Sequence, residues 1–262
     1  KVTTVSETYS HEIRYAYFAH GLHDILSSQS YKLSGIVNGI DTKIYDPSKA
    51  MFPFKPSDLS GKLKTKKALL ERLGLDNDSS APLIIMISRL AEHKGFELLQ
   101  YIGEEMINST NIRLAVLGTG EKKYEDYVNY LAYIFPGRVS ANIMFDTGLA
   151  DFMYAGADFL LMPSKSEPCG LSQLIAMRYG TIPIVRETGG LVDTVPPINN
   201  DTLEGRGITF KVYNAHDMLG AVKRAEALYY DKDKFKKIVS SVMRYDSSWK
   251  NAALQYMDVY EK

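Results

Sequence analysis

Short apolar segments alternate with amphipathic segments along most of this chain. Continuous apolar runs such as LIIMI at 83–87 and FLLM at 159–162 are bounded by turn residues, and an amphipathic stretch follows each of them. Strands that are apolar at every position, each leading into a helix, are typical of a parallel sheet covered on both faces. The pattern therefore predicts an α/β fold built on a doubly wound, Rossmann-like parallel sheet.

The pattern also sets the expected order of elements. Strands are expected at 2–5, 35–39, 81–88, 111–118, 138–145, 157–164, 181–186 and 208–210. Helices are expected at 7–15, 62–75, 95–106, 121–135, 147–155, 170–180, 215–230, 232–243 and 248–261. Residues 16–34 and the proline-containing stretch 41–61 are expected to be irregular. The lysine-rich segment KLKTKK at 62–67 is interpreted as a solvated helix face rather than a patch that binds a polyanion.

The amino-acid composition fits an ordinary globular protein. The chain has 262 residues, of which 45% are apolar and 24% charged, and 31 Lys and Arg balance 31 Asp and Glu. These values exclude a disordered or rod-like chain. A net charge of zero offers no attraction to nucleic acid or to an anionic membrane, and no apolar run approaches the roughly 18–20 residues that cross a bilayer. We therefore expect neither nucleic acid nor a membrane as a partner.

Two features concern the context of the chain. Cys169 is the only cysteine, so no internal disulfide can form, which fits a reducing compartment. The sequence begins at Lys1 rather than at a methionine, and VTTVS at 2–6 already has the pattern of a strand. We therefore expect the chain to be a piece of a longer protein.

Candidate chemistry is expected in the loops that follow the strands, because open parallel sheets bind ligands outside the carboxyl ends of their strands. The first such loop, SRLAEHKG at 88–95, carries Arg89 and Lys94 beside a predicted helix start. A guanidinium, an ammonium and the N–H donors of a helix start outline a diphosphate site. On composition alone, however, a surface loop with solvated charges is the favoured interpretation.

Two further loops have unusual residues. In SKSEPCGLSQ at 164–173, Glu167 is suited to accept hydrogen bonds from sugar hydroxyls, and Gly170 lets a ligand approach the backbone. An acid near a helix start that interacts with the helix dipole is an equally good interpretation of Glu167. In ETGGLVDTV at 187–195, Gly189 and Gly190 form either a turn that contacts a ligand or a plain turn. Composition alone leaves these alternatives open.

Taken together, these motifs resemble a known family. The segments SRLAEHKG, EPCGLSQ, AMRYGTIPIVRETGGLVDTV and LSGIVNGID (33–41) are similar to those of bacterial glycogen synthases and plastid starch synthases. The match runs in order from VTTVSETYSHEI (2–13) to DSSW (246–249). The resemblance implies a retaining glycosyltransferase of the GT-B type, with this chain as its C-terminal half. Such an enzyme transfers glucose from ADP-glucose to the non-reducing end of an α-1,4-glucan.

The resemblance also implies roles for individual residues. Arg89 and Lys94 would hold the diphosphate of the donor and stabilise the departing ADP, and Glu167 would bind hydroxyls of the donor glucose. These three are the expected catalytic residues. Phe145 stands where the family often has Tyr, and its ring would stack on the adenine. The other expected residues of the donor pocket are Cys169, Gly170, Leu171, Ser172, Thr188, Gly189 and Gly190.

Cys169 and His93 each have a reactive and an inert interpretation. A helix N-terminus beside Cys169 would lower the pKa of its thiol, and an inert buried thiol is an equally good interpretation. His93 takes the place of the Gln in the family's loop and would serve as an acid or base, although a solvent-facing loop residue is favoured. Lys165 and Ser166 are further departures from the family, on the acceptor side of its site.

The family has two Rossmann-like domains with the active site in the cleft between them. Its N-terminal domain begins with a Lys-x-Gly-Gly-Leu loop, which is absent from this sequence. Residues 1–34 would be a remnant of that domain with the interdomain linker, and 35–262 would be the C-terminal, nucleotide-sugar-binding domain. The last helix, 248–261, with Trp249 near its start, would pack back toward the N-terminal domain. The expected partners are therefore ADP-glucose or ADP, the glucan acceptor and the missing domain, and the chain alone is expected to be inactive.

The resemblance implies no metal or other cofactor, and a cytoplasmic location, or a plastid location for a starch synthase. Two alternatives belong to other classes. The first is a non-catalytic regulatory or glucan-binding module of the same fold, which would not need Arg89, Lys94 and Glu167 together. The second is another GT-B glucosyltransferase, which the EPCGL motif and its spacing disfavour.

Overall fold

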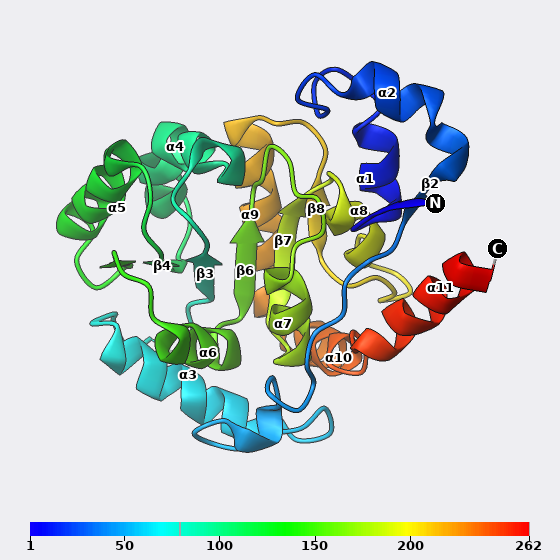
Figure 1. Cartoon of the computed structure of the whole chain (residues 1–262). Helices are drawn as coiled ribbons and strands as arrows, with labels where there is room; N and C mark the ends of the chain where they lie inside the picture. Colours follow the sequence, from blue (N-terminus) through cyan, green and yellow to red (C-terminus); the bar gives the residue numbers. More distant parts are fainter. Residues whose placement is uncertain (79, 262) are drawn as a thin grey trace.

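The centre of the molecule is a parallel sheet. The computed structural model describes residues 1–78 and 80–261, and in them six parallel strands lie in the order β5-β4-β3-β6-β7-β8 (Figure 1). They are β3 (Leu83–Ile87), β4 (Arg113–Leu117), β5 (Val139–Asn142), β6 (Phe159–Met162), β7 (Ile182–Arg186) and β8 (Ile208–Phe210). This order is that of a doubly wound Rossmann-like fold, which confirms the predicted fold class.

Two groups of helices cover the sheet. One group contains α4 (Phe96–Asn108), α5 (Lys122–Ile134) and α9 (Ala215–Tyr230), which pack against one another. The other contains α3 (Ser60–Arg72), α6 (Thr147–Gly156), α7 (Ser172–Arg178) and α10 (Lys232–Val242). Because both faces are covered, the strands are apolar at successive positions, and Leu83, Ile84 and Ile85 of β3 are fully buried.

The N-terminal segment forms a small unit beside the main sheet. Strand β1 (Val2–Thr4) pairs in parallel with β2 (Leu33–Gly35), and α1 (Glu7–Glu12) and α2 (His23–Ser28) lie between them in the sequence. The prediction of a strand at 35–39 is wrong, because the register with β1 ends at Gly35. A side chain at Gly35 would meet the backbone oxygen of Ser6 at 2.0 Å. Residues 16–34 are also less irregular than expected, since they contain α2 and the 3-10 turn η1 (Ser30–Lys32).

The last helix, α11 (Trp249–Glu261), begins beside the chain that leaves the N-terminal unit (Figure 1). Ile40 and Ser248 form an isolated parallel bridge, and the Ile40 amide donates to the carbonyl of Ser247 over 2.8 Å. The indole of Trp249 is about half exposed. Its role as an anchor for a further domain stays a prediction.

The lysine-rich segment in α3 differs from the sequence-based expectation. Lys62 and Lys66 are buried, with exposed fractions of 5% and 3%. The Lys62 ammonium donates to the carbonyls of Ala155 and Tyr179 and to Thr181 Oγ1 over 2.9–3.1 Å. The prediction of a solvated face is therefore wrong for both lysines, because the ends of neighbouring elements supply acceptors that replace water.

Among the residues that the structure describes, no helix combines the length and the apolar character that crossing a membrane requires.

Candidate functional site

Three loops meet at the carboxyl ends of the strands. They follow β3, β6 and β7, and β3 and β6 are the neighbours at which the strand order reverses. The Lys165 amide donates to the carbonyl of His93 over 2.9 Å, and the Gly190 amide donates to the carbonyl of Glu167 over 3.0 Å. The structure thus brings the three predicted loops together at the point where doubly wound sheets bind their ligands.

Lys94 and Glu167 form an ion pair at the centre of this arrangement. Lys94 Nζ lies 2.6 Å from Glu167 Oε2, and Ser164 Oγ donates to the same oxygen over 3.1 Å. The carboxylate side chain is only 8% exposed, whereas the lysine side chain is 21% exposed. A buried carboxylate is stable only when it is paired and hydrogen bonded, so the lysine that faces the opening also stabilises the acid behind it.

The local backbone brings Lys94 to this position. The lysine ends a 3-10 turn, η3 (Glu92–Lys94), and Gly95 follows with φ of 81°, a left-handed conformation that glycine adopts without strain. A Cβ atom at Gly95 would lie 2.2 Å from the carbonyl oxygen of Pro163. The loop after β3 can therefore approach the end of β6 only with glycine at this position.

The helix-dipole interpretation of Glu167 does not fit the structure. Helix α7 begins at Ser172, five residues after Glu167, and the carboxylate pairs with Lys94 instead. The interpretation as a ligand-binding acid stays a prediction, since no comparison tests the roles of individual site residues.

Arg89 and His93 lie on the same loop as Lys94. Both are exposed, and both line the groove described below. Burial, together with the charges of Lys94 and Arg89, lowers the pKa of the His93 imidazole. This shift favours the neutral ring, so the positive charge of this loop comes mainly from Arg89 and Lys94.

The predicted lowering of the Cys169 pKa is wrong. The side chain is 6% exposed, and burial raises the pKa of its thiol, with a further rise from the negative charges of Glu167 and Asp193. The physical reason is that α7 begins at Ser172, so Cys169 does not lie in the first turn of the helix. The structure favours the alternative of a buried thiol of low reactivity.

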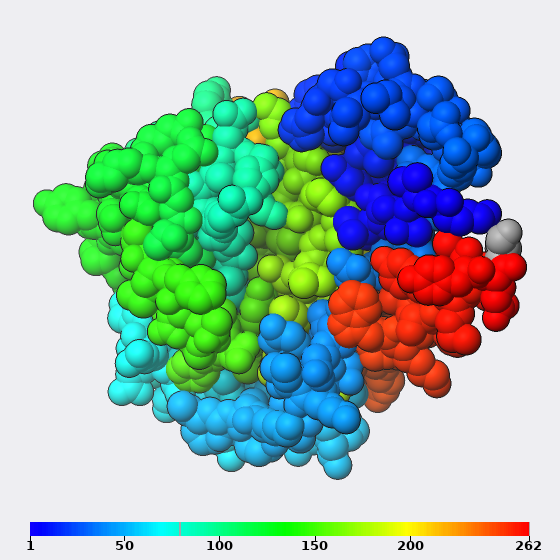
Figure 2. All heavy atoms as spheres, viewed as in Figure 1, coloured from blue at the N-terminus to red at the C-terminus, as the bar shows by residue number. Residues whose placement is uncertain are grey.

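The loops line two openings that share Lys94 and Glu167 in their walls. A pocket of about 70 Å³ lies beneath the Lys94–Glu167 pair and is bounded by Gly170, Leu171 and Ser172. A larger groove of about 800 Å³ begins at the same pair. Its lining on the side of the sheet includes Arg89, His93, Lys94 and Glu167, and on the other side Tyr9, Tyr17, Phe18 and His20. In Figure 2 this face is hollowed between the teal part of the chain and the dark blue N-terminal segment.

Thr188 and Gly189 are held by the N-terminal segment. Thr188 Oγ1 donates to Glu12 Oε1 over 3.0 Å, and the Gly189 amide donates to the same oxygen over 2.9 Å. Sequence reasoning missed Tyr9 and Glu12 because residues 1–34 were assigned to a remnant and a linker. The segment VTTVSETYSHEI, which is part of the resemblance, was the available signal.

Phe145 lies apart from the ion pair, in the loop between β5 and α6. Its ring is 89% exposed. An exposed ring at the carboxyl end of the sheet is available for stacking, but its contact with a base stays a prediction.

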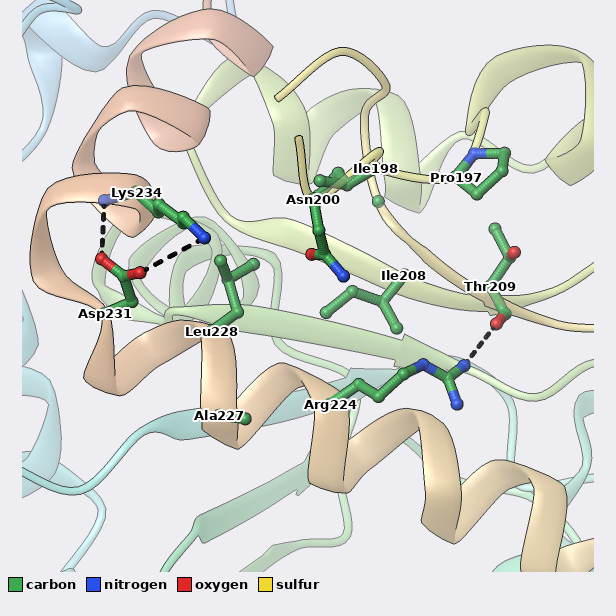
Figure 3. Close-up of a pocket in the computed structure, with 11 residues that line it drawn as sticks. Pro197, Ile198, Asn200, Ile208, Thr209, Arg224, Ala227, Leu228, Asp231 and Lys234 are labelled. Carbon is green, nitrogen blue, oxygen red and sulfur yellow. Dashed lines mark hydrogen bonds and ion pairs between the residues drawn. The ribbon is translucent and has the colours of Figure 1, made fainter. Parts of the chain in front are cut away.

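A separate pocket of about 420 Å³ lies at the edge of the sheet, beside β8 and α9 (Figure 3). Its two cationic side chains have partners of their own: Arg224 donates to the carbonyl of Thr209 over 2.7 Å, and Lys234 pairs with Asp231. Of the predicted site residues, six line the two openings described above, namely Arg89, Lys94, Glu167, Gly170, Leu171 and Ser172. In residues 1–78 and 80–261, no three His, Cys, Asp or Glu side chains gather as metal ligands would.

Comparisons with known proteins agree with the fold. A family model described as glycosyl transferases group 1 matches residues 71–240. The chain is 50% identical to a glycogen synthase of Clostridium novyi over 262 residues, which cover 99% of this chain and 54% of that protein. It is 43% identical to a glycogen synthase of Bacillus subtilis, covering 100% of this chain and 54% of that protein. The chain thus spans about half the length of these curated relatives.

Among solved structures, the chain is similar to the catalytic domain of starch synthase IV from Arabidopsis thaliana, bound to ADP and acarbose. The TM-score is 0.92 at 36% identity, over 99% of this chain and 55% of that one. A sucrose-phosphate synthase from Thermosynechococcus elongatus has a TM-score of 0.66 at 20% identity, over 99% of this chain and 57% of that one. At that identity the second likeness concerns the fold alone.

Proposed function

This chain belongs to the glycosyl transferases group 1 family, and from that premise we propose that it is the donor-binding half of a glycogen synthase. The reaction is the transfer of glucose from ADP-glucose to the non-reducing end of an α-1,4-glucan, with retention of configuration. The observation that carries the proposal is the Lys94–Glu167 pair at the opening of a groove whose rim also bears Arg89.

The proposed mechanism follows from the charges of these three residues. When the bond between the sugar and ADP breaks, negative charge develops on the departing diphosphate, and positive charge develops at the sugar. Arg89 and Lys94 stabilise the first charge, as preorganised groups do most effectively where water is excluded. The Glu167 carboxylate, held by Lys94 and Ser164, accepts hydrogen bonds from the sugar hydroxyls.

The rest of the donor pocket is proposed to act through its backbone. Cys169, Gly170, Leu171 and Ser172 form the ledge beneath the sugar and phosphates, and the pocket of about 70 Å³ that three of them bound supports this role. The Thr188–Gly190 turn lies beside the same ledge, and Phe145 stacks on the adenine. The choice of an adenine nucleotide is supported by the starch synthase IV structure, which was solved with ADP.

The remaining expectations concern the context of the reaction. Curated relatives are about twice as long as this chain, and we propose that a second domain forms the other wall of the cleft and binds the glucan. The 262-residue chain alone is proposed to bind ADP weakly and not to elongate glucan. The reaction is proposed to need no metal. A cytoplasmic location, or a plastid location for a starch synthase, is proposed from the resemblance alone.

The test is a calorimetric titration of this chain with ADP, UDP and ADP-glucose. We expect ADP and ADP-glucose to bind more tightly than UDP, with affinities that do not change when EDTA is added. No heat of binding with either adenine nucleotide would refute the assignment as a donor-binding domain. A labelled-glucose assay with added glycogen tests the second part of the proposal, and measurable glucan synthesis by the chain alone would refute it.

A further inference from the structure

The loops of the candidate site are joined to the N-terminal segment by a set of hydrogen bonds from residues 6–12. Ser6 Oγ donates to the carbonyl of Pro168 over 2.6 Å, and Ser6 is fully buried. The Thr8 amide and hydroxyl both donate to the carboxylate of Asp193, with an N–O distance of 3.0 Å for the amide. One short segment therefore contacts the loop after β6 and the short helix α8 (Gly190–Thr194) that follows β7.

Glu12 contacts the turn that packs against the backbone of Glu167. Its Oε1 accepts from the Thr188 hydroxyl over 3.0 Å and from the Gly189 amide over 2.9 Å. Thr188 is 1% exposed and Glu12 is partly buried, so the bond is partly shielded from water. Hydrogen bonds to a charged acceptor in such surroundings are among the stronger ones in proteins.

The backbone held by Glu12 has an unusual conformation. Gly189 has φ of 46° and ψ of −133°, and a Cβ atom there would lie 2.1 Å from the carbonyl oxygen of Glu167. The next residue, Gly190, donates its amide to that carbonyl over 3.0 Å. The position of the Thr188–Gly190 turn therefore sets the position of the backbone that carries Glu167.

From these contacts we infer that Glu12 is a positioning residue for the donor site. Its carboxylate holds the Thr188–Gly190 turn against the backbone of Glu167, and it thereby fixes the geometry in which Lys94 and Glu167 meet the nucleotide sugar. The inference rests on the proposed function, because it assigns a role in donor binding to a residue outside the three loops. The action of Glu12 is indirect: it touches the turn and not the substrate.

Two substitutions separate the positioning role from a merely structural one. Glu12→Ala removes both hydrogen bonds, whereas Glu12→Gln keeps a side-chain oxygen that can accept them. Glu7→Ala is the matched control, because Glu7 lies in the same helix with an exposed side chain that bonds to His11 and to the Gly35 amide, away from the loops. ADP affinity is measured by calorimetry, well below the melting temperature of each variant.

We expect Glu12→Ala to weaken ADP binding about tenfold, which corresponds to the loss of a hydrogen bond to a charged group. Glu12→Gln and Glu7→Ala should stay within about threefold of the unmodified chain. A purely structural role would lower the melting temperature of Glu12→Ala and leave its ADP affinity unchanged, which would overturn the inference. Tighter ADP binding would also overturn it, because it would make Glu12 a competitor of the nucleotide.

Hydrogen exchange gives a readout that does not depend on nucleotide. In the Glu12→Ala variant, peptides covering 187–195 should exchange faster than in the unmodified chain, and in Glu7→Ala they should not. Unchanged exchange would contradict the positioning role even if the proposed function holds. An unmodified chain that binds neither ADP nor ADP-glucose would refute the proposed function, and the role of Glu12 in donor binding would fall with it.

Discussion

Two lysine–carboxylate pairs of equal length lie at opposite ends of the parallel sheet. Lys94 and Glu167 meet over 2.6 Å after β6, and Lys66 and Asp158 meet over 2.6 Å before it. The Lys66–Asp158 pair is sealed, with side chains 4% and 6% exposed, whereas Lys94 is 21% exposed. The same chemical pair is thus partly exposed in a groove at one end of the sheet, and at the other end it is almost fully buried in the wall of a pocket of about 490 Å³.

The two ammonium groups differ in how many of their hydrogens already have an acceptor within the protein. Lys66 Nζ donates to the carbonyl of Ala81, to Asp158 and to the hydroxyl of Tyr229 over 2.6–2.8 Å, which uses the three hydrogens of the ammonium. Burial opposes the charge on Lys66, but Asp158 and Tyr229 outweigh it and raise the pKa. Lys94 has Glu167 as its hydrogen-bonded partner and lines the groove, so other donors of its ammonium are available to a ligand there. Short distance alone therefore does not distinguish a pair that a ligand can reach from a buried one.

The largest expected effect comes from breaking the sealed pair. Asp158→Ala leaves two lysines buried without a counter-charge, and such an uncompensated charge should cost about 3–5 kcal/mol of unfolding free energy. Urea unfolding measures the loss. Asp126→Ala, which breaks the exposed Lys122–Asp126 pair on α5, is the control and should leave the midpoint nearly unchanged. A loss below about 1 kcal/mol in Asp158→Ala would show that the sealed pair is not structural.

Lys94→Ala tests the open pair. The substitution removes a charged donor from the groove and should weaken ADP binding about tenfold to a hundredfold, since bonds to charged groups contribute about 1.5–3 kcal/mol. Calorimetry with ADP is the measurement. The control is Lys67→Ala, an exposed lysine on α3 at the other end of the sheet. Equal ADP affinities for the two variants would remove Lys94 from the diphosphate site.

The pH dependence of the unfolding free energy tests the burial of Lys62, which lies near the Lys66–Asp158 pair. Burial lowers the pKa of Lys62 to about 7, while the unfolded chain keeps the ordinary value of 10.5. Between these values the unfolded state binds more protons, so this group makes the unfolding free energy rise with pH, by about 2 kcal/mol from pH 7 to pH 9. Lys62→Met should remove that rise. Parallel stability curves for the variant and the unmodified chain would show that Lys62 does not titrate in this range.

The smallest expected effect is on the alkylation rate of Cys169, in the loop after β6. Because burial raises the pKa of its thiol, alkylation by iodoacetamide at pH 7 should be slower than that of a free cysteine. Bound ADP should slow the reaction severalfold further, since Cys169 lies on the proposed ledge. Mass spectrometry follows the modified fraction over time. Equal rates with and without ADP would place Cys169 outside the pocket.

The sequence predicted the main sheet well, because its strands are apolar runs that packing on both faces requires. Strand β3, expected at 81–88 and observed at Leu83–Ile87, is one example. The loops with Arg89, Glu167 and Gly189 follow β3, β6 and β7 as the pattern predicted, whereas ligand binding at these loops stays a prediction. Both results depend on residues that are neighbours in the sequence.

The features that the sequence did not predict depend on contacts between residues far apart in the chain. Lys62 was expected in water because lysines are seldom buried, and its acceptors Ala155 and Thr181 follow it by 93 and 119 residues. The bond from Thr188 to Glu12 spans 176 residues. No local pattern encodes such a contact, so tertiary structure was needed to identify either one.

The backbone contacts between the loops have a consequence for protein engineering. Gly95 packs against Pro163, Gly189 against the carbonyl of Glu167, and Gly190 against the carbonyl of Cys169, each at a distance that leaves no room for a side chain. A loop transplanted alone from another transferase would collide with its neighbours if it lacked glycine at these positions. Exchanging the three loops together, with these glycines kept, is therefore expected to preserve the site better than exchanging one loop alone.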